Sequence, residues 1–420
     1  MKDFISRVRE HCGLTRRYFF QLSGATAAAW SGSPLAAAGT DADPQLREAT
    51  AKLEYLTPLD RAFLLDKGKA GVAKLAPESL REIGLVPETW SLDVVADPAS
   101  SSIVDQPLSR ALGNALNWNG LMKLAEKHAI RFLHPCICTN GDDPFHVDLW
   151  EGVPLREVIW MVKPKANIRR VCYQSYHAEN LAPFQGSLPL SQILETPPGQ
   201  TPVVLAYKMN GQMIAAAHGG PVRVVVPGTY GSKSIKWVQR IALTNDYKAN
   251  DTDAADFNND VESAMKTKAR FITPPKEVPA ETPVALTGLA LVGISGLAKV
   301  QYCVHSQKEP WPGDDIYWTK ADWKDAAILP PPEDWGGGIP GGKLPADTEL
   351  FDPAKGTPIR WPMRFTIAHW AALLSGLPTG SYDLCCRTID GNGIAQPMPR
   401  PFLRTGANAI HRVTLEVKAP

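Results

Sequence analysis

Residues 205–223 read Leu-Ala-Tyr-Lys-Met-Asn-Gly-Gln-Met-Ile-Ala-Ala-Ala-His-Gly-Gly-Pro-Val-Arg, and residues 227–237 continue with Pro-Gly-Thr-Tyr-Gly-Ser-Lys-Ser-Ile-Lys-Trp. This stretch sets His218, Arg223 and Lys236 among several glycines. Glycine lets backbone N–H groups approach an anion closely, and arginine and lysine supply the matching charge. The pattern indicates an anchor for a phosphorylated ligand. The alternative interpretation is a basic surface strand flanked by loops.

A second stretch, residues 134–140, reads His-Pro-Cys-Ile-Cys-Thr-Asn and follows an expected strand over 130–133. A cysteine thiolate on a loop after a strand is a soft ligand that suits a transition metal. The spacing Cys-x-Cys puts both sulfurs within reach of one site, and one of Cys136 and Cys138 is expected to be the ligand and the other to pack. A buried structural role for both is the alternative.

Together these two stretches resemble the sulfite oxidase family of molybdopterin enzymes. The similarity covers about residues 75–420 and includes a Trp-x-Gly-x-x-Leu segment over 150–155 and a C-terminal run over 386–413. It implies a molybdenum ion held by one pterin dithiolene and one protein cysteine. Cys138 is the better match to the family's ligand, because Cys138-Thr-Asn140 follows a Cys-x-Asn pattern, and Cys136 is the alternative. The residues that the resemblance assigns to the cofactor are Cys138, Asn140, His177, His218, Arg223, Lys233 and Lys236.

The substrate side of the family's site matches less well. The resemblance assigns Trp150, Tyr247 and Arg404 to catalysis beside Cys138, with Phe257 as the alternative to Tyr247. The arginine that usually follows the ligand cysteine is replaced by the run Gly-Asp-Asp at 141–143. An acidic pair there would repel a dianion such as sulfite.

The first 38 residues are expected to be a twin-arginine export signal. Residues 14–20 read Leu-Thr-Arg-Arg-Tyr-Phe-Phe, an apolar stretch follows, and Ala-Ala-Ala at 36–38 fits a cleavage site. The mature chain would then be periplasmic, with residues 39–75 as an arm containing a helix over 44–56. An ordinary basic amphipathic helix is the alternative. No later segment reads as a membrane span.

The rest of the chain reads as an α+β protein of two domains. The full sequence of 420 residues carries a formal net charge of +1, which excludes a strongly basic nucleic-acid binder, and its 37 prolines favour a loop-rich chain. Residues 76–273 alternate strands with helices at 118–128 and 188–194, and form the expected molybdopterin-binding domain. After a proline-rich linker, residues 274–420 read as an all-β immunoglobulin-like sandwich with an insertion over 305–361. The expected strands are 284–292, 298–304, 363–368, 380–390 and 409–417.

The expected function is that of a periplasmic molybdenum oxidoreductase. It would oxidise sulfite or a related small sulfur compound by oxygen-atom transfer and pass electrons to a separate carrier such as a c-type cytochrome, because the chain has no haem-attachment motif. One alternative is a reductase of sulfoxides or similar molecules on the same fold. The other is a non-catalytic subunit that uses the insertion for docking. Homodimerisation follows from the resemblance alone.

Overall fold

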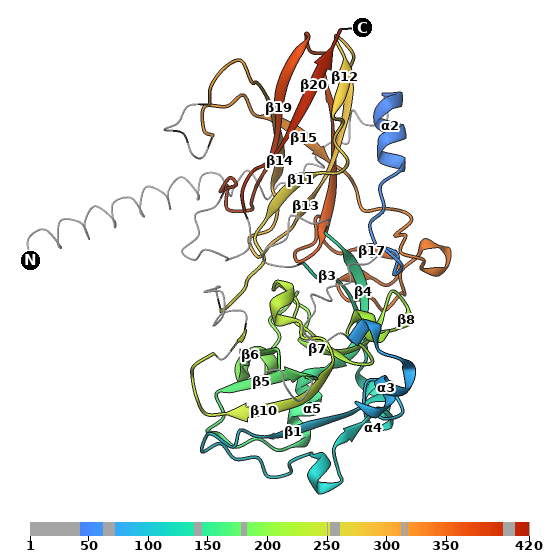
Figure 1. Cartoon of the computed structure of the whole chain (residues 1–420), viewed down its shortest axis with the longest axis vertical. Helices are drawn as coiled ribbons and strands as arrows, with labels where there is room; N and C mark the ends of the chain where they lie inside the picture. Colours follow the sequence, from blue (N-terminus) through green and yellow to red (C-terminus); the bar gives the residue numbers. More distant parts are fainter. Residues whose placement is uncertain are drawn as a thin grey trace, which may run out of the picture.

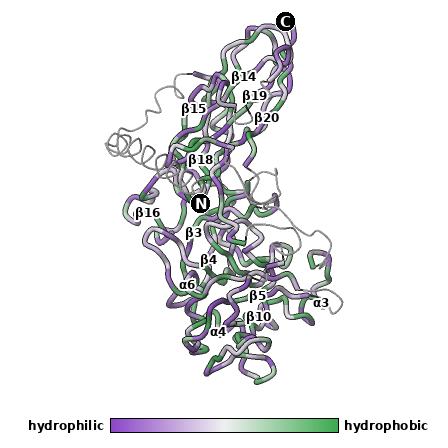
Figure 2. The backbone as a smooth tube through the Cα atoms, turned by 90° about the vertical axis from the view of Figure 1, so that its left-hand side faces the viewer, coloured by the Kyte–Doolittle hydropathy of each residue, from purple (hydrophilic) through white to green (hydrophobic). Residues whose placement is uncertain are grey.

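The computed structural model describes residues 43–61, 72–137, 145–177, 183–249, 251–252, 261–311, 315, 318–397 and 408–419. Figure 1 shows two parts stacked along the long axis: a mixed α/β part built from the first half of the chain and a β-rich part built from the second half. In the perpendicular view of Figure 2, β3 and β4 again lie between the two parts. Both parts of the expected α+β architecture are therefore present.

One five-stranded sheet of the mixed part has the order β2-β1-β10-β5-β6. The central pair, β1 and β10, is parallel, whereas the remaining pairs are antiparallel. A parallel pair needs a long crossover, and here the crossover contains the second sheet. The strands are β1 (Ser91–Ala96), β2 (Leu116–Asn117), β5 (Arg170–Ser175), β6 (Gln185–Pro189) and β10 (Val238–Thr244).

The second sheet of the mixed part is antiparallel, with the order β3-β4-β7-β8 and with β9 paired to β7. Every residue of β4 is buried, as expected for a strand covered on both faces. Its strands are β3 (Ile130–Pro135), β4 (Val147–Pro154), β7 (Val204–Met209), β8 (Gln212–Met213) and β9 (Arg223–Val225).

One apolar core connects the two sheets of the mixed part. It joins Leu92 and Val94 of the first sheet to Leu205 and Val224 of the second. The helix expected over 118–128 is confirmed as α4. The Asn117 side chain caps its N-terminus, where it accepts a hydrogen bond from the N–H of Gly120 at 2.9 Å. The helices are α2 (Pro44–Ala51), α3 (Pro77–Glu82), α4 (Trp118–His128), α5 (Leu155–Met161) and α6 (Leu190–Leu194), with short 3-10 turns η1 (Val72–Lys74), η2 (Arg110–Leu112), η3 (Ala216–His218), η4 (Gly231–Lys233) and η5 (Pro340–Gly342).

The C-terminal part consists of two packed groups of strands, β11-β13-β18 and β14-β19-β20-β12, joined by β15. Phe271, Leu286 and Trp370 of one group share a core with Leu384 and Leu415 of the other, which is the packing expected of a sandwich. The strands are β11 (Lys268–Phe271), β12 (Glu277–Pro279), β13 (Val284–Leu291), β14 (Lys299–Ser306), β15 (Lys324–Ile328), β18 (Ile367–Leu374), β19 (Gly380–Ile389) and β20 (His411–Lys418).

The segment 305–361, expected to be an insertion, is partly a component of this sheet region. Its strand β15 pairs with both β14 and β18. Its later part, which contains the small hairpin of β16 (Phe351–Asp352) and β17 (Thr357–Pro358), packs against the mixed part. There the N–H of Glu349 donates to the carbonyl of Arg131 at 2.7 Å. The segment therefore connects the two parts as well as completing the sheet.

The N-terminal arm packs on the C-terminal part rather than extending into solvent. Helix α2 ends at Ala51, several residues before the expected boundary. The buried ring of Tyr55 contacts Trp335 with 4.7 Å between centroids, and its hydroxyl donates to the carbonyl of Ile367 at 2.9 Å. No helix within the described residues is both long enough and apolar enough to span a membrane.

Candidate functional site

The glycine-rich stretch and the cysteine segment meet at one place in the mixed part. The N–H of Gly231 donates to the carbonyl of Ile137 at 2.7 Å, so η4 holds the chain that follows β3. The N–H of Trp237 donates to the carbonyl of Gly219 at 2.9 Å, which ties the start of β10 to the turn after η3. Two segments that lie far apart in sequence, one at Ile137 and the other at Gly231, thus form one cluster.

Arg223 is the centre of this cluster. Its side chain is buried, and its two terminal nitrogens donate to the carbonyls of His218 and Ser234, each at 2.9 Å. One of these nitrogens also lies 3.8 Å from the Sγ atom of Cys136, and the guanidinium stacks over the Trp150 ring at 5.1 Å. Its buried Nε atom has no hydrogen-bond partner among the described residues. Arg223 is therefore a fixed positive charge with donor capacity left for a ligand.

Lys236 and His218 stand beside Arg223. The ammonium of Lys236 donates to the carbonyl of Ala217 at 3.3 Å and lies 5.5 Å from the centre of the Trp237 ring. Partial burial lowers the pKa of His218, and the charges of Lys236 and Arg223 lower it further. The imidazole is therefore neutral at neutral pH, and it can donate one hydrogen bond and accept another.

The Cys136 thiol faces the same charges. Burial raises its pKa, and the nearby Asp148 carboxyl also raises it, whereas Arg223 and Lys236 oppose the shift. Without a ligand the thiol stays protonated at neutral pH. A bound metal ion would displace the proton, and the two cations would stabilise the resulting thiolate.

Asp148 and Asn210 form a buried support behind the cluster that the sequence interpretation did not single out. Burial raises the pKa of Asp148 to about 7. The Asn210 amide donates to Asp148 at 3.1 Å, and its oxygen accepts from the N–H of Leu149 at 2.8 Å. The Met-Asn-Gly turn is the one sequence signal near this pair. Asp148 and Asn210 are 62 residues apart, so local sequence patterns do not predict their contact.

The structure brings Cys136, Trp150, His218, Arg223 and Lys236 together. Trp150 is fully buried beneath Arg223, and its indole N–H donates to the carbonyl of His134 at 3.0 Å. His177 is exposed at the edge of the cluster, since the N–H of the preceding Tyr176 donates to the carbonyl of Trp237 at 2.7 Å. Cys138, Asn140, Phe257 and Arg404 lie outside the described residues.

Lys233 and Tyr247 are not directed into this cluster. The Lys233 ammonium is buried and pairs with Asp251 at 2.5 Å, while it also donates to the carbonyl of Ser187 at 3.0 Å. Tyr247 is 72% exposed and follows the far end of β10, whereas Lys236 precedes the near end. The family-implied roles of these two residues therefore stay predictions.

The residues of the cluster fit a phosphorylated metal cofactor. A buried guanidinium with an unpaired nitrogen, a second cation and a neutral imidazole suit an anionic group with several oxygens. A thiol whose thiolate these cations stabilise suits a metal ion. Gly219 keeps the turn open, since its φ is +97° and an added Cβ would lie 2.5 Å from the Cγ atom of Lys236.

Comparison with known proteins shows which class of domain contains this cluster. Residues 85–251 match the family model described as the oxidoreductase molybdopterin binding domain, and this range contains the whole cluster. The chain therefore carries the molybdopterin-binding domain of this family, and the proteins similar to part of it include nitrate reductases and sulfite oxidases. The resemblance inferred from the two sequence stretches is thereby confirmed.

Two relatives illustrate how far the sequence similarity extends. The chain is 34% identical over 98 residues to a nitrate reductase [NADPH] of Beauveria bassiana, covering 23% of this chain and 11% of that protein. It is 37% identical over 107 residues to the mitochondrial sulfite oxidase of Drosophila melanogaster, covering 22% and 18%. The matches thus span less than a fifth of these relatives.

The fold extends much further than the sequence similarity. A crystal structure of the sulfane dehydrogenase SoxCD from Paracoccus pantotrophus aligns with 93% of this chain and 97% of that one, at a TM-score of 0.54 and 16% identity. This similarity confirms the expected combination of a mixed α/β molybdopterin domain with a β-rich C-terminal region.

Substituting Gly219 by alanine should damage the site. A positive φ in a non-glycine residue costs about 1–3 kcal/mol, and the new Cβ would push Lys236 aside. We expect a lower unfolding temperature together with reduced molybdenum content in the purified protein. Gly211→Ala is the matched control, because Gly211 has φ +79° but nothing within 4 Å of an added Cβ. Equal molybdenum content in the two variants would contradict the proposed role of the Gly219 turn.

Proposed function

We propose that this chain is a molybdenum-pterin oxidoreductase of sulfite oxidase type. In this proposal it oxidises a small sulfur compound by oxygen-atom transfer and passes the electrons to a separate carrier such as a c-type cytochrome. The observation that carries the proposal is the convergence of Arg223, Lys236, His218 and the Cys136 segment within the matched domain. The twin-arginine pattern at 14–20 supports a periplasmic location.

The chain's own residues would hold the cofactor through charge and through one thiolate. Arg223 and Lys236 would neutralise its phosphate, with Arg223 held in place by two backbone carbonyls. His218, neutral at pH 7, would share hydrogen bonds with the pterin. When bound, molybdenum supplies a two-electron change that accompanies transfer of an oxygen atom. The buried Asp148 and Asn210 would fix the strand end beside the thiol.

Fewer observations support the substrate class than support the cofactor. Two of the proteins similar to part of this chain are sulfite oxidases, and the structure that aligns over 93% of the chain is named a sulfane dehydrogenase. Sulfite and sulfane compounds are therefore the first substrates to examine. The two aspartates at 142–143 favour a second candidate, a reductase of neutral sulfoxides, because they would repel a dianion.

Steady-state assays on the full chain, produced with a working molybdenum cofactor supply, separate the two candidates. We expect sulfite or a sulfane compound to reduce added cytochrome c. The second arm offers dimethyl sulfoxide with a reduced viologen dye as the electron donor. Dye oxidation without any cytochrome reduction would overturn the oxidase proposal and support the reductase.

The cysteine ligand is assigned by comparing Cys138→Ser with Cys136→Ser. Serine replaces a soft thiolate by a hard oxygen, so loss of the ligand should reduce molybdenum content below about a tenth of the parent's. The resemblance predicts this loss for Cys138→Ser. Cys136→Ser should retain most of the metal, with a modest loss because its thiol contacts Arg223. The reverse pattern, measured by metal analysis of both proteins, would move the ligand to Cys136.

A further inference from the structure

A short segment after α2, residues 55–59, runs from the C-terminal part to the cofactor cluster; we call it the strap. Its first end is fixed on the C-terminal part. Leu56 is fully buried, and its N–H donates to the carbonyl of Trp335 at 2.9 Å. The hydroxyl of the preceding Tyr55 donates to the carbonyl of Ile367 at 2.9 Å. Packing and hydrogen bonds therefore hold this end of the strap in one place.

The middle of the strap contacts the buried support of the cofactor cluster. The N–H of Thr57 donates to the carbonyl of Val147 at 3.1 Å, where β4 begins. The carbonyl of Thr57 accepts a hydrogen bond from the Asn210 amide at 2.9 Å, and the same amide nitrogen donates to Asp148 at 3.1 Å. Asn210 thus joins the strap to the acid whose charge acts on the Cys136 thiol.

The last residue of the strap reaches the cluster itself. Leu59 packs against the apolar group that contains Trp150 and that Cys136 also contacts. Burial and the nearby cations lower the pKa of His218, and the carbonyl of Leu59, which accepts a hydrogen bond from the ring, opposes this shift. An imidazole that donates to a backbone carbonyl presents its other nitrogen in a fixed direction. Leu59 therefore orients a side chain that we assign to the cofactor.

A glycine of the segment 305–361 provides the space that Leu56 occupies. Gly337 has φ +67°, and an added Cβ would lie 2.6 Å from the Cβ of Leu56 and 3.6 Å from the Nδ2 atom of Asn210. The next residue, Gly338, has φ +75° but nothing within 4 Å of an added Cβ. Of these two neighbours, Gly337 is the one that the strap requires to be a glycine.

We propose that the strap positions His218 and Asn210 for the cofactor, so that docking of the strap and binding of the cofactor stabilise each other. Such coupling is reciprocal: the cofactor should stabilise the docked strap by the same factor by which the strap strengthens cofactor binding. This inference rests on the proposed cofactor site, whereas docking of the strap can be measured without the cofactor.

Gly337→Ala tests the effect of the strap on the cofactor. The new Cβ would displace Leu56 and disturb Asn210 beside it. We expect the loaded variant to lose molybdenum about tenfold faster than the parent during dialysis, within the usual range of coupling between sites. Gly338→Ala is the matched control, because it has the same kind of backbone strain without a contact to the strap. It should release molybdenum at the parent's rate.

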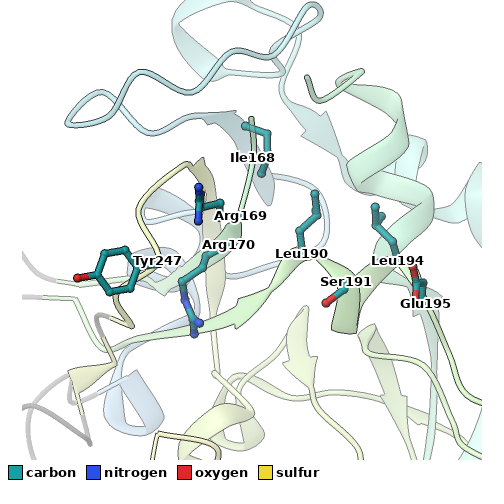
Figure 3. A pocket seen from close by; sticks show the side chains of 8 residues that line it. All are labelled: Ile168, Arg169, Arg170, Leu190, Ser191, Leu194, Glu195 and Tyr247. Carbon is teal, nitrogen blue, oxygen red and sulfur yellow. The ribbon is translucent and has the colours of Figure 1, made fainter. Parts of the chain in front are cut away.

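Leu194→Ala controls for a general loss of stability in the mixed part. The Leu194 side chain lines a pocket beside α6 (Figure 3), and it packs against the core that joins the two sheets rather than against the group that Leu59 contacts. We expect a lower unfolding temperature with an unchanged rate of molybdenum release. Release as fast as that of Gly337→Ala would show that lost stability causes the effect, and it would overturn the inference.

Hydrogen exchange of the parent tests the effect of the cofactor on the strap without any substitution. The amides of Leu56 and Thr57 report docking, because both donate to carbonyls outside the strap. We expect them to exchange about tenfold more slowly in the loaded chain than in a chain produced without the cofactor. The amide of Gln307, which donates to the carbonyl of Ser381 in the C-terminal part, should exchange equally in both.

Two results would each overturn the inference. One is equal exchange of the strap amides in the loaded and the empty chain. The other is equal molybdenum release from Gly337→Ala and Gly338→Ala. Failure of the proposed function is recognised separately, because the parent itself would then carry no molybdenum.

Discussion

Arg223→Ala is expected to purify with less than about a tenth of the parent's molybdenum. Removing a charged donor from a phosphate contact costs about 3 kcal/mol, on the order of a hundredfold in affinity. The same change leaves the carbonyls of His218 and Ser234 without their donor, so the free energy of unfolding should fall by about 2–4 kcal/mol. Metal analysis and denaturant unfolding of the same preparation measure both effects.

Two further variants separate cofactor loss from unfolding. Lys236 is only half-buried and its hydrogen bond to the carbonyl of Ala217 is long, at 3.3 Å, so Lys236→Ala should lose molybdenum while its stability changes by less than about 1 kcal/mol. Arg387 stacks on Trp323 at 4.0 Å in the C-terminal part, and Arg387→Ala is the matched control for a stacked arginine. A folded Arg223→Ala protein with full molybdenum content would contradict the placement of the cofactor at this cluster.

Lys233→Ala should be among the most destabilising single substitutions in the chain. The side chains of Lys233 and Asp251 are 4% and 5% exposed, and removing one partner of such a buried pair costs about 3–5 kcal/mol. Replacing both, as in Lys233→Met with Asp251→Leu, should recover most of this loss, because no buried charge then remains unpaired. Urea unfolding of Lys233→Met, Asp251→Leu and the double variant measures the coupling.

An exposed pair supplies the control for this cycle. Lys299 and Asp325 lie 2.8 Å apart at 51% and 55% exposure, so Lys299→Ala should cost less than about 1 kcal/mol. The result also decides between two roles for Lys233. If Lys233→Ala has the parent's unfolding free energy but loses its molybdenum, Lys233 binds the cofactor, as the resemblance implies. Its pairing with Asp251 would then not be its main role.

Local sequence signals predicted the elements whose causes are themselves local. Helix α4 has a capping asparagine at 117 and begins and ends where expected. The glycine-rich stretch indicated a cluster of His218, Arg223 and Lys236, which the structure brings together, whereas the binding of an anion there stays a prediction. Strand β18, by contrast, begins at Ile367, four residues after the expected start at 363.

Contacts between distant residues could not be predicted in the same way. Asp148 meets Asn210 across two strands, and Lys233 turns away from the cluster because Asp251 and the Ser187 carbonyl hold its ammonium. The segment 305–361 was interpreted as an insertion because its many tryptophans, prolines and glycines gave no clear strand pattern. The strand β15 within it is defined by its pairing with β14 and β18. Such pairings depend on tertiary packing, which overrides local propensity.

The central claim is that this chain holds one molybdenum-pterin group at the Arg223 cluster. The most direct measurement is the molar ratio of molybdenum and pterin to protein in the purified full chain, produced in a host that makes the cofactor. We predict about one molybdenum and one pterin per chain. A chain that folds but carries neither, while a sulfite oxidase produced in the same host is fully loaded, would contradict the account.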